Sequence, residues 1–344
     1  MTAEPLVVVD ADVLGRSRTG DETYTENLLA ALAPLAEGIR VAAVTRHPEI
    51  VPPGIWPVHL PAGSQELRMA WSLPRLLTRL RPALGHFQYT LPLGLRPPAV
   101  LTVHDLSFER DPTLMGRRDR LTFRTMVPRA VRRAERVFAV SERTRLDLIE
   151  LYGTPPDKIV VTPNGVDPAF SPRRAPGEEE GEPYLLFVGA IQERKDPLAA
   201  ADAAAAVGLP LVVAGPKKEP SLARELERRG ARVLGYVSKA ELATLYRGAS
   251  ALLLPSRFEG FGLPVLEAMA SGTPVVAAPE PALREVAGDA ALYAERGELA
   301  DAVRRALAER DALRAAGLER AKAFSWRETA RRTVAAYKEV LGLS

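Results

Sequence analysis

The sequence predicts an α/β protein made of two doubly wound domains of similar size. The chain has 344 residues, which is too long for one ordinary domain and suits two. Short β-branched runs alternate with longer amphipathic segments, a pattern typical of sheets whose strands are mainly parallel. Near the middle, residues 171–183 are rich in proline, glycine and glutamate, which indicates a solvated linker.

Strands of the first half are expected where branched or small apolar residues follow one another. These runs are Leu6–Val9, Val41–Val44, Ala99–Val103 and Arg136–Val140. Two segments between them repeat apolar residues at helical spacing, and they are Tyr24–Leu35 and Glu66–Leu80.

The second half begins the same alternation again. Its expected strands are Tyr184–Val188, Leu211–Ala214, Ala231–Leu234, Ala251–Leu254 and Pro274–Ala277. Its expected helices are Pro197–Val207, Ser221–Arg229, Lys239–Arg247, Glu298–Ala316 and Arg327–Leu341, the last capped by Ser325. Open parallel sheets bind ligands beyond the carboxyl ends of their strands, so we expect a ligand in a cleft between the two domains.

Composition excludes several classes of protein. Hydrophobic residues make up 47% and charged residues 26%, a balance that argues against disorder. The chain has no cysteine, which excludes a disulfide scaffold, a thiol nucleophile and a cysteine metal site. A net charge of +3 gives little reason to expect a nucleic-acid partner. We see no signal peptide or membrane-spanning run, and we expect a cytoplasmic protein.

The most informative segment, Pro255–Ala278, carries a carboxylate on a glycine-rich loop. It follows an expected strand, and Gly260 and Gly262 flank Phe261 directly after Glu259. Glycines there allow the backbone to approach a ligand closely.

A helix is expected to follow this loop. Pro264 suits its first turn, Gly272 is a plausible stop, and Glu267 falls about one turn inside. Free amides at a helix N-terminus favour phosphate, and two carboxylates can accept hydrogen bonds from sugar hydroxyls.

A second segment, Leu185–Pro197, supports the same chemistry. A strand ends in Gly189, and adjacent Arg194 and Lys195 precede a helix. These cations could neutralise the charge on a leaving nucleoside diphosphate without a metal. The alternative is an ordinary solvated Arg-Lys pair.

The Glu259 to Glu267 spacing resembles the E-x₇-E motif of the family-four retaining glycosyltransferases, which have the GT-B fold of two Rossmann-like domains facing a cleft. The resemblance implies that Glu259 holds hydroxyls of the donor sugar and Glu267 holds the donor ribose. It implies a diphosphate role for Arg194 and Lys195, which match the family's Gly-x-Arg-Lys loop. It also implies backbone contacts to the donor from Gly189, Gly260, Phe261, Gly262, Leu263 and Val265.

The loop after the first strand departs from the family pattern. Gly20 and Tyr24 match the family's Thr-Gly-x-Gly-x-Tyr loop, which approaches the donor phosphates, but Glu22 replaces the second glycine. A carboxylate there would repel a diphosphate unless a cation or an acceptor hydroxyl met it.

His104 and Asp105 follow the strand Ala99–Val103. A lone histidine at a strand end is usually a structural hydrogen-bonding group, although it can transfer protons. In the family a His-Asp pair at this strand end faces the reacting sugar, so the resemblance favours a catalytic role for His104. We interpret His86 as structural.

Two further patterns leave alternatives open. Asp10 and Asp12 could bind a divalent ion, but we favour a structural role and expect no metal site. Residues 117–136 contain eight arginines among apolar residues. They could lie on anionic lipid at the inner membrane face, or form an ordinary amphipathic helix pair broken near Pro128.

The sequence thus predicts a retaining, metal-independent hexosyltransferase without a cofactor beyond its nucleotide-sugar donor. Mannose from GDP-mannose is favoured, and the acceptor is a hydroxyl of a glycan, a lipid-linked glycan or a small molecule. A UDP-hexose donor and a catalytically degenerate binding protein are the alternatives, while a dinucleotide oxidoreductase lacks its Gly-x-Gly-x-x-Gly fingerprint. The expected parts are an acceptor-side domain, a linker, a donor-side domain and a C-terminal helix packed on the first domain, at residues 1–170, 171–183, 184–325 and 326–344.

Overall fold

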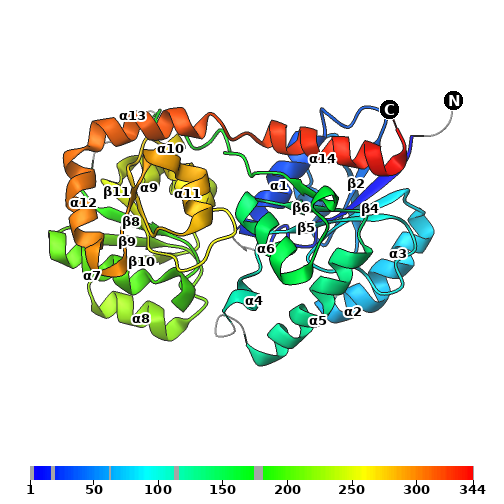
Figure 1. Ribbon diagram of the computed structural model, residues 1–344, viewed down its shortest axis with the longest axis horizontal. Coiled ribbons are helices and arrows are strands. Elements are labelled where there is room, and N and C mark those ends of the chain that lie inside the picture. Colours follow the sequence, from blue (N-terminus) through cyan, green and yellow to red (C-terminus); the bar gives the residue numbers. More distant parts are fainter. Residues whose placement is uncertain (1–3, 17–19, 62, 112–115, 174–180, 344) are drawn as a thin grey trace. The chain divides into compact units, whose positions relative to one another are not determined.

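The computed structural model describes residues 4–16, 20–61, 63–111, 116–173 and 181–343. The chain forms two compact units, shown in Figure 1. Unit 1 comprises residues 1–165 and 326–344, and unit 2 comprises residues 166–325. Residues 174–180 of the predicted linker lie outside the described residues.

Unit 1 is built on a parallel sheet of seven strands. They are β1 Leu6–Asp10, β2 Arg40–Thr45, β3 Trp56–His59, β4 Leu84–Gln88, β5 Ala99–Val103, β6 Arg136–Ala139 and β7 Ile159–Val161. Their order is β3-β2-β1-β4-β5-β6-β7, with Val8 of β1 opposite Ala42 on one side and Gly85 on the other. The strand order reverses between β1 and β4, which is where open α/β sheets bind ligands.

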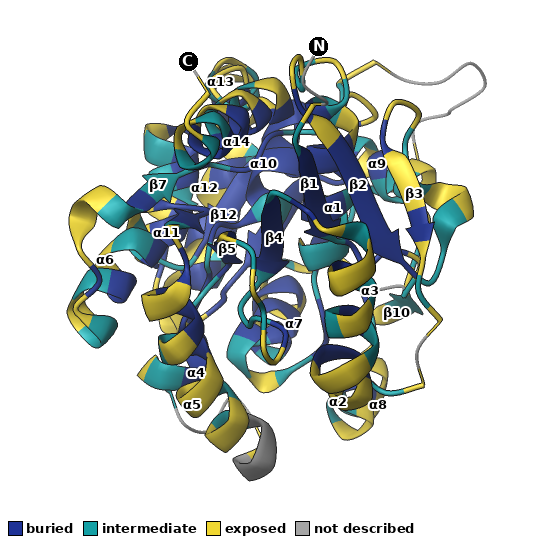
Figure 2. Ribbon diagram, turned by 90° about the vertical axis from the view of Figure 1, so that its right-hand side faces the viewer, coloured by how far each residue is buried: buried dark blue, intermediate teal, exposed yellow. Residues whose placement is uncertain are grey.

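Helices cover both faces of this sheet, whose central strands are buried in Figure 2. The longer ones are α1 Gly20–Leu32, α3 Leu73–Leu80, α5 Arg117–Arg133, α6 Glu142–Tyr152 and α14 Trp326–Leu341. The short ones are η1 Pro48–Ile50, α2 Gln65–Leu67, the π-helical turn η2 Arg68–Ser72, α4 Ser107–Arg110 and η4 Pro156–Lys158. Helix α14 packs beside α1, which confirms that the C-terminal helix returns to the first domain.

Of the two alternatives left open for residues 117–136, the helix pair broken near Pro128 is wrong, because α5 runs unbroken through that residue. A proline inside a helix removes one N–H and crowds the preceding turn. Here Val127, Ala130 and Val131 are buried in the core of unit 1. Burial of this apolar stripe offsets the cost of the proline.

A buried polar network fastens α14 to the sheet. The Tyr337 hydroxyl lies 2.5 Å from Nδ1 of His86, and His86 Nε2 lies 2.7 Å from the Thr102 hydroxyl. Thr102 also meets the Tyr24 hydroxyl of α1 at 2.9 Å. Burial lowers the pKa of His86 to about 3, so the ring is neutral. His86 therefore has the structural role expected of it.

Unit 2 is built on a parallel sheet of six strands in the order β10-β9-β8-β11-β12-β13. They are β8 Leu185–Val188, β9 Leu211–Ala214, β10 Arg232–Gly235, β11 Ala251–Leu254, β12 Val275–Ala277 and β13 Leu292–Tyr293. The order reverses between β8 and β11, the strands that lead into both predicted donor loops. The two parallel sheets agree with the predicted pair of Rossmann-like domains.

Helices and short turns surround this second sheet. They are η5 Glu193–Lys195, α7 Pro197–Val207, α8 Pro220–Arg228, α9 Lys239–Gly248, α10 Leu263–Ala270, α11 Pro281–Ala287, η6 Gly288–Ala290, η7 Arg296–Glu298, α12 Leu299–Ala308 and α13 Arg310–Ala321. The single helix predicted at Glu298–Ala316 was wrong, because the chain turns at Glu309. Helix α12 packs against α7, whereas α13 packs against α10. One straight helix could not make both contacts, so the chain turns between them. Within the described part of the chain, no helix is both long and apolar enough to cross a membrane.

We predict that acid destabilises the protein through His86. An unfolded histidine has a pKa near 6.5, whereas the folded ring has a pKa of about 3. Between these values only the unfolded chain is protonated, so the free energy of unfolding falls as the pH falls from 6.5 towards 3. Urea titrations of wild type and His86→Gln from pH 4 to 7.5 measure this. We expect a shallower slope for the variant, and parallel slopes would contradict the assignment.

Candidate active site

The loop between β11 and α10 has a backbone that requires glycine. Gly262 has a φ of +101°, and a Cβ on it would lie 2.6 Å from a methyl carbon of Leu283. The Phe261 ring packs edge-on against Phe324, with ring centroids 5.8 Å apart. Val265 donates its N–H to the Gly262 carbonyl at 3.0 Å, so a ligand that took this amide would compete with that bond.

A buried ion pair joins the two predicted donor loops. Nζ of Lys195 lies 2.5 Å from Oε1 of Glu259, and the two residues are 9% and 6% exposed. Two opposite charges in a low-dielectric setting attract strongly but also lose hydration, so the geometry must be held firmly. The structure thereby brings together Lys195 and Glu259, which are 64 residues apart in the sequence.

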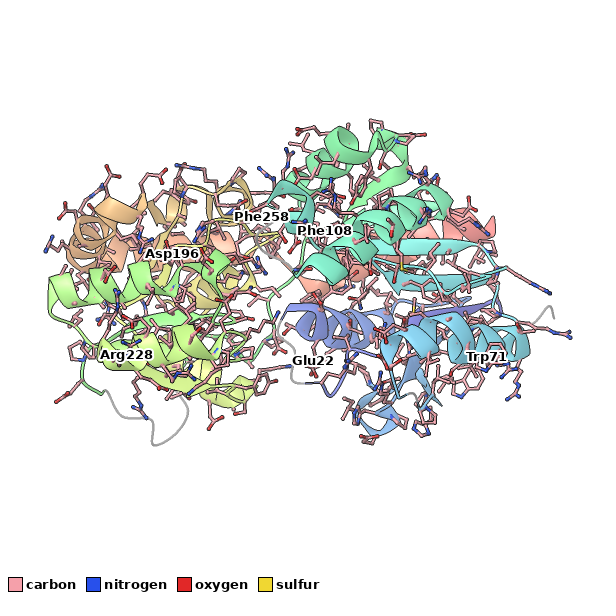
Figure 3. The ribbon with its side chains drawn as sticks, turned by 90° about the horizontal axis from the view of Figure 1, so that it is seen from below. Glu22, Trp71, Phe108, Asp196, Arg228 and Phe258 are labelled. Atoms are coloured by element: carbon pink, nitrogen blue, oxygen red, sulfur yellow. The ribbon has the colours of Figure 1, made fainter. Side chains whose placement is uncertain are left out.

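Two hydrogen bonds to backbone carbonyls hold the same two loops together. The Arg194 guanidinium donates to the carbonyl of Phe258, labelled in Figure 3, at 3.0 Å. The N–H of Arg257 donates to the Arg194 carbonyl at 2.9 Å. Arg194 therefore lies next to the ion pair with part of its guanidinium engaged by the neighbouring loop.

The end of β8 lies very close to the next strand along the sheet. Gly189 has a φ of +151°, and a Cβ on Gly215 would lie 2.0 Å from the Gly189 carbonyl oxygen. Sequence reasoning selected Gly189 and missed Gly215, although the Gly-Pro pair after a buried strand signals it. The close approach explains glycine at position 215, and the positive φ explains glycine at position 189.

Glu267 lies on α10 in a site that disfavours its charge. Burial raises the pKa of this carboxyl to about 7, although the Tyr246 hydroxyl donates to it at 2.9 Å. Asp167 also raises the pKa, and Lys239, which pairs with Asp167 at 2.6 Å, lowers it. Sequence reasoning missed these three partners.

Glu280 is another buried carboxylate that sequence reasoning missed. Its Oε2 accepts hydrogen bonds from the N–H groups of Ala282 and Leu283 at 2.7 and 3.2 Å, which caps α11. Because Leu283 lies against the Gly262 position, this cap fixes the surface on which the β11–α10 loop rests.

In unit 1, His104 ends a chain of hydrogen bonds. Its Nε2 lies 2.9 Å from Oε1 of Gln88, whose amide nitrogen donates to the Thr25 hydroxyl at 2.7 Å. Thr25 in turn donates to the carbonyl of Asp21 at 2.8 Å. This order assigns the proton to Nε2 and leaves a lone pair on Nδ1. Burial lowers the pKa of His104, although Asp21 and Asp105 oppose the shift, so the ring is a neutral base.

Other predicted residues of unit 1 have more local contacts. Asp105 accepts hydrogen bonds from the backbone N–H and the hydroxyl of Ser107, at 3.0 and 2.8 Å. Gly20 begins α1, and a Cβ there would meet nothing within 4 Å. Glu22 accepts the N–H of Gly15 at 2.7 Å, so its carboxylate helps to close the loop after β1.

Arginines surround Asp10, the last residue of β1, and Asp12, two residues later. Arg68 is completely buried, with its guanidinium 2.5 Å from Asp10 and 3.3 Å from Asp12. Arg46 and Arg16 meet Asp12 at 2.8 and 3.0 Å. These ion pairs support the structural interpretation of the aspartates. Among the described residues, no three histidine, aspartate or glutamate side chains are grouped so as to hold a metal ion.

Comparisons with known proteins agree with these features. The chain matches two family descriptions, "Glycosyltransferase Family 4" over residues 18–170 and "Glycosyl transferases group 1" over residues 171–324. It is 32% identical over 269 residues to O-antigen chain mannosyltransferase B of Escherichia coli, covering 70% of each chain. It is 36% identical over 254 residues to D-inositol 3-phosphate glycosyltransferase of Kineococcus radiotolerans, covering 61% of this chain and 58% of that one.

Solved structures show the same fold. Sucrose-phosphate synthase of Thermosynechococcus elongatus superposes with a TM-score of 0.80 at 21% identity, covering 99% of this chain and all of the other. Anabaena HepE in complex with UDP-glucose gives a TM-score of 0.74 at 16% identity, covering 97% and 99%. These likenesses confirm the predicted GT-B fold.

We predict that the Lys195–Glu259 pair contributes strongly to stability. Lys195→Met leaves the Glu259 carboxylate buried without its cation, which should cost about 3–5 kcal/mol of unfolding free energy. Lys217 provides a matched control, because its ion pair with Glu227 at 2.9 Å is exposed to solvent. Lys217→Met should cost under about 1 kcal/mol. Urea unfolding measures the loss of unfolding free energy in both variants. Equal losses would show that the buried ion pair stabilises the fold no more than the exposed one.

Proposed function

The chain belongs to the group 1, family 4-like glycosyltransferases, and on that basis we propose that it is a retaining hexosyltransferase. It transfers a hexose from a nucleotide-diphosphate sugar to a hydroxyl of a glycan, a lipid-linked glycan or a small molecule. The observation that carries the proposal is the buried contact between Lys195 and Glu259 beside Arg194. This contact places a carboxylate, which can accept hydrogen bonds from sugar hydroxyls, next to two cations, which can bind a diphosphate. A sugar linked to a diphosphate requires both.

Unit 2 holds the donor in this proposal. Glu259 accepts hydrogen bonds from hydroxyls of the transferred sugar, and Glu267 accepts them from the ribose. Lys195 has three N–H donors, so it can keep Glu259 and still bind a phosphate oxygen. Together with Arg194 and the amides that begin α10, it stabilises the charge that develops on the departing diphosphate. These groups do the work that a metal ion does in other transferases, so the reaction needs no metal.

The donor we favour is GDP-mannose. The Escherichia coli relative is named a mannosyltransferase, which supports this choice. A UDP-hexose is the alternative, supported by the structural likeness to HepE solved with UDP-glucose. Nucleotide sugars are available in the cytoplasm, and the absence of cysteine fits a reducing compartment.

Unit 1 receives the acceptor in this proposal, near His104. A neutral ring with a lone pair on Nδ1 can accept a hydrogen bond from a sugar hydroxyl. The attacking hydroxyl approaches the face from which the diphosphate departs and gives its proton to a leaving phosphate oxygen. Trapping of a covalent glycosyl-enzyme adduct would overturn this step.

A nucleotide-sugar-binding protein without catalysis is the second candidate. Glu22 favours it, because a carboxylate replaces the family's second phosphate-facing glycine. The hydrogen bond from the Gly15 N–H to Glu22 weakens this argument against catalysis, because the loop itself already engages the carboxylate. Donor binding without turnover of any hydroxyl acceptor, in both wild type and Glu22→Gly, would favour this candidate.

We predict that the right donor raises the melting temperature and that both donor loops are needed. A ligand at 100 times its Kd stabilises the fold by about 2.7 kcal/mol. A thermal-shift panel compares GDP-mannose, UDP-glucose, related sugar nucleotides and NAD. The readout is the ligand-induced shift, because Lys195→Met and Glu259→Gln also lower the melting temperature of the free protein. Both variants should lose the shift while Lys217→Met keeps it, and a shift retained in all three would refute the assigned site.

We predict that donor affinity increases with pH around neutrality. Glu267 has a pKa of about 7 in the free protein, so acid protonates it and removes a hydrogen-bond acceptor for the ribose. The Kd for an intact sugar nucleotide should therefore rise below pH 7, towards tenfold per pH unit. Calorimetric titration from pH 5.5 to 8.5 measures this. Glu267→Gln should bind weakly and without this dependence, and an unchanged pH profile in the variant would exclude Glu267 as its source.

A further inference from the structure

Large apolar side chains are exposed at one end of unit 1. Of the ten exposed large hydrophobic residues in the described part of the chain, five come from this region. We name them the apolar rim, and they are Leu67, Trp71, Leu93, Leu121 and Met126. Leu93 is 70% exposed and Trp71 is 58% exposed. Exposed apolar residues that gather in one region mark an interaction surface.

The rim comes from three segments, and the middle one, the loop after β4, touches each of the other two. Leu67 and Trp71 are one helical turn apart along α2 and η2. The loop after β4 is tied to this turn by the N–H of Leu93, which donates to the Met69 carbonyl at 2.9 Å. The same loop contacts α5, where the Phe123 ring lies 5.7 Å from that of Tyr89.

The figures agree on this arrangement. Figures 1 and 2 both show α2 and α5 at the same end of unit 1, and Figure 2 shows exposed residues along both helices. Figure 3 views the molecule from that side and shows Trp71 at the surface of the unit. The rim therefore lies on one face, beside the loops that follow β4 and β5.

Arginines accompany these apolar side chains. Residues 120–133 contain five arginines and no acidic residue. Arg124 pairs with Glu109, and Arg133 pairs with Glu135 at 3.7 Å, whereas Arg129 and Arg132 have no ion pair among the described residues and are exposed. In α3, the guanidinium of Arg75 lies 3.5 Å from the centre of the ring of Trp71, which belongs to η2. A partner for this face must accept both aromatic surface and excess positive charge.

We propose that the apolar rim docks on an anionic lipid surface. Tryptophan and leucine enter the boundary between headgroups and acyl chains, while arginines bind the phosphates beside them. The excess of arginine over acidic residues favours an anionic bilayer over a second copy of the chain, whose rim would carry the same charge. Docking would bring the loop after β4, and with it Gln88 and His104, close to molecules embedded in the membrane. The inference does not depend on the proposed reaction, because lipid binding is measured without turnover.

Tryptophan fluorescence tests the proposal directly. The chain has three tryptophans, of which Trp326 is buried and Trp56 and Trp71 are exposed. In Trp56→Phe, Trp71 is the exposed reporter. We expect a blue shift and co-sedimentation with vesicles containing phosphatidylglycerol, much less with phosphatidylcholine alone, and a loss of binding at high salt. No binding to the anionic vesicles would overturn the proposal.

Matched variants separate the rim from other exposed tryptophan. Trp71→Ala with Leu93→Ala should weaken vesicle partition at least about tenfold. Replacing Arg129, Arg132 and Arg133 by glutamine should weaken it about fivefold per arginine. Trp56→Ala is the control, because Trp56 is 42% exposed and has Arg40 over its ring at 5.3 Å. Equal losses in control and rim variants would overturn the proposal.

Two further measurements keep the result interpretable. Melting temperatures should stay near wild type, because every substituted side chain is on the surface. Transfer to a water-soluble acceptor should also stay unchanged, so a failed membrane test is distinguishable from a failed enzyme assignment. If light scattering instead shows a dimer that Trp71→Ala dissociates, the rim is an interface between copies and the lipid proposal is wrong.

Discussion

The candidate donor site depends on one electrostatic constraint, which is the burial of Lys195 against Glu259. Removing both charges from water is costly, so the pair is stable only where neighbouring atoms hold its geometry. The loop of Glu259 rests against Leu283 at Gly262, and Arg194 holds it through a hydrogen bond to the Phe258 carbonyl. A donor that bridges a carboxylate and an ammonium group therefore meets a site that is already arranged, and little ordering cost remains at binding.

Unit 1 also buries charged and polar groups at the ends of its strands, and it pairs them with different partners. Arg68 is wholly buried and faces Asp10 and Asp12, which keeps charge at the end of β1 neutralised. His86 remains neutral because burial disfavours its doubly protonated, charged form, and its two nitrogens meet hydroxyl groups. The charges of Asp10 and Asp12 and both ring nitrogens of His86 are therefore engaged before any ligand arrives. Unit 1 also leaves the apolar rim and neighbouring arginines exposed to solvent.

Sequence reasoning succeeded where the signal is local. Strands β1, β5, β9 and β11 are continuous apolar runs and were found. Strands β3, β4, β7 and β13 were missed, because polar residues, proline or glycine interrupt β3 and β4, and β7 and β13 have only three and two residues. The loop–helix segment that carries Glu259 and Glu267 was recognisable for the same reason. Tyr246, Asp167 and Lys239 were not, because tertiary packing alone brings them towards Glu267. The functional roles assigned to these residues stay predictions.

Helix α14 has a consequence for the order in which the protein can be made. Unit 2 is continuous in the sequence, so all of it has left the ribosome before residues 326–341 appear. Unit 1 is interrupted by it, and until Tyr337 emerges His86 lacks the hydroxyl that meets its Nδ1. During translation the second unit can therefore reach its native packing while the first waits, incomplete, for its final helix.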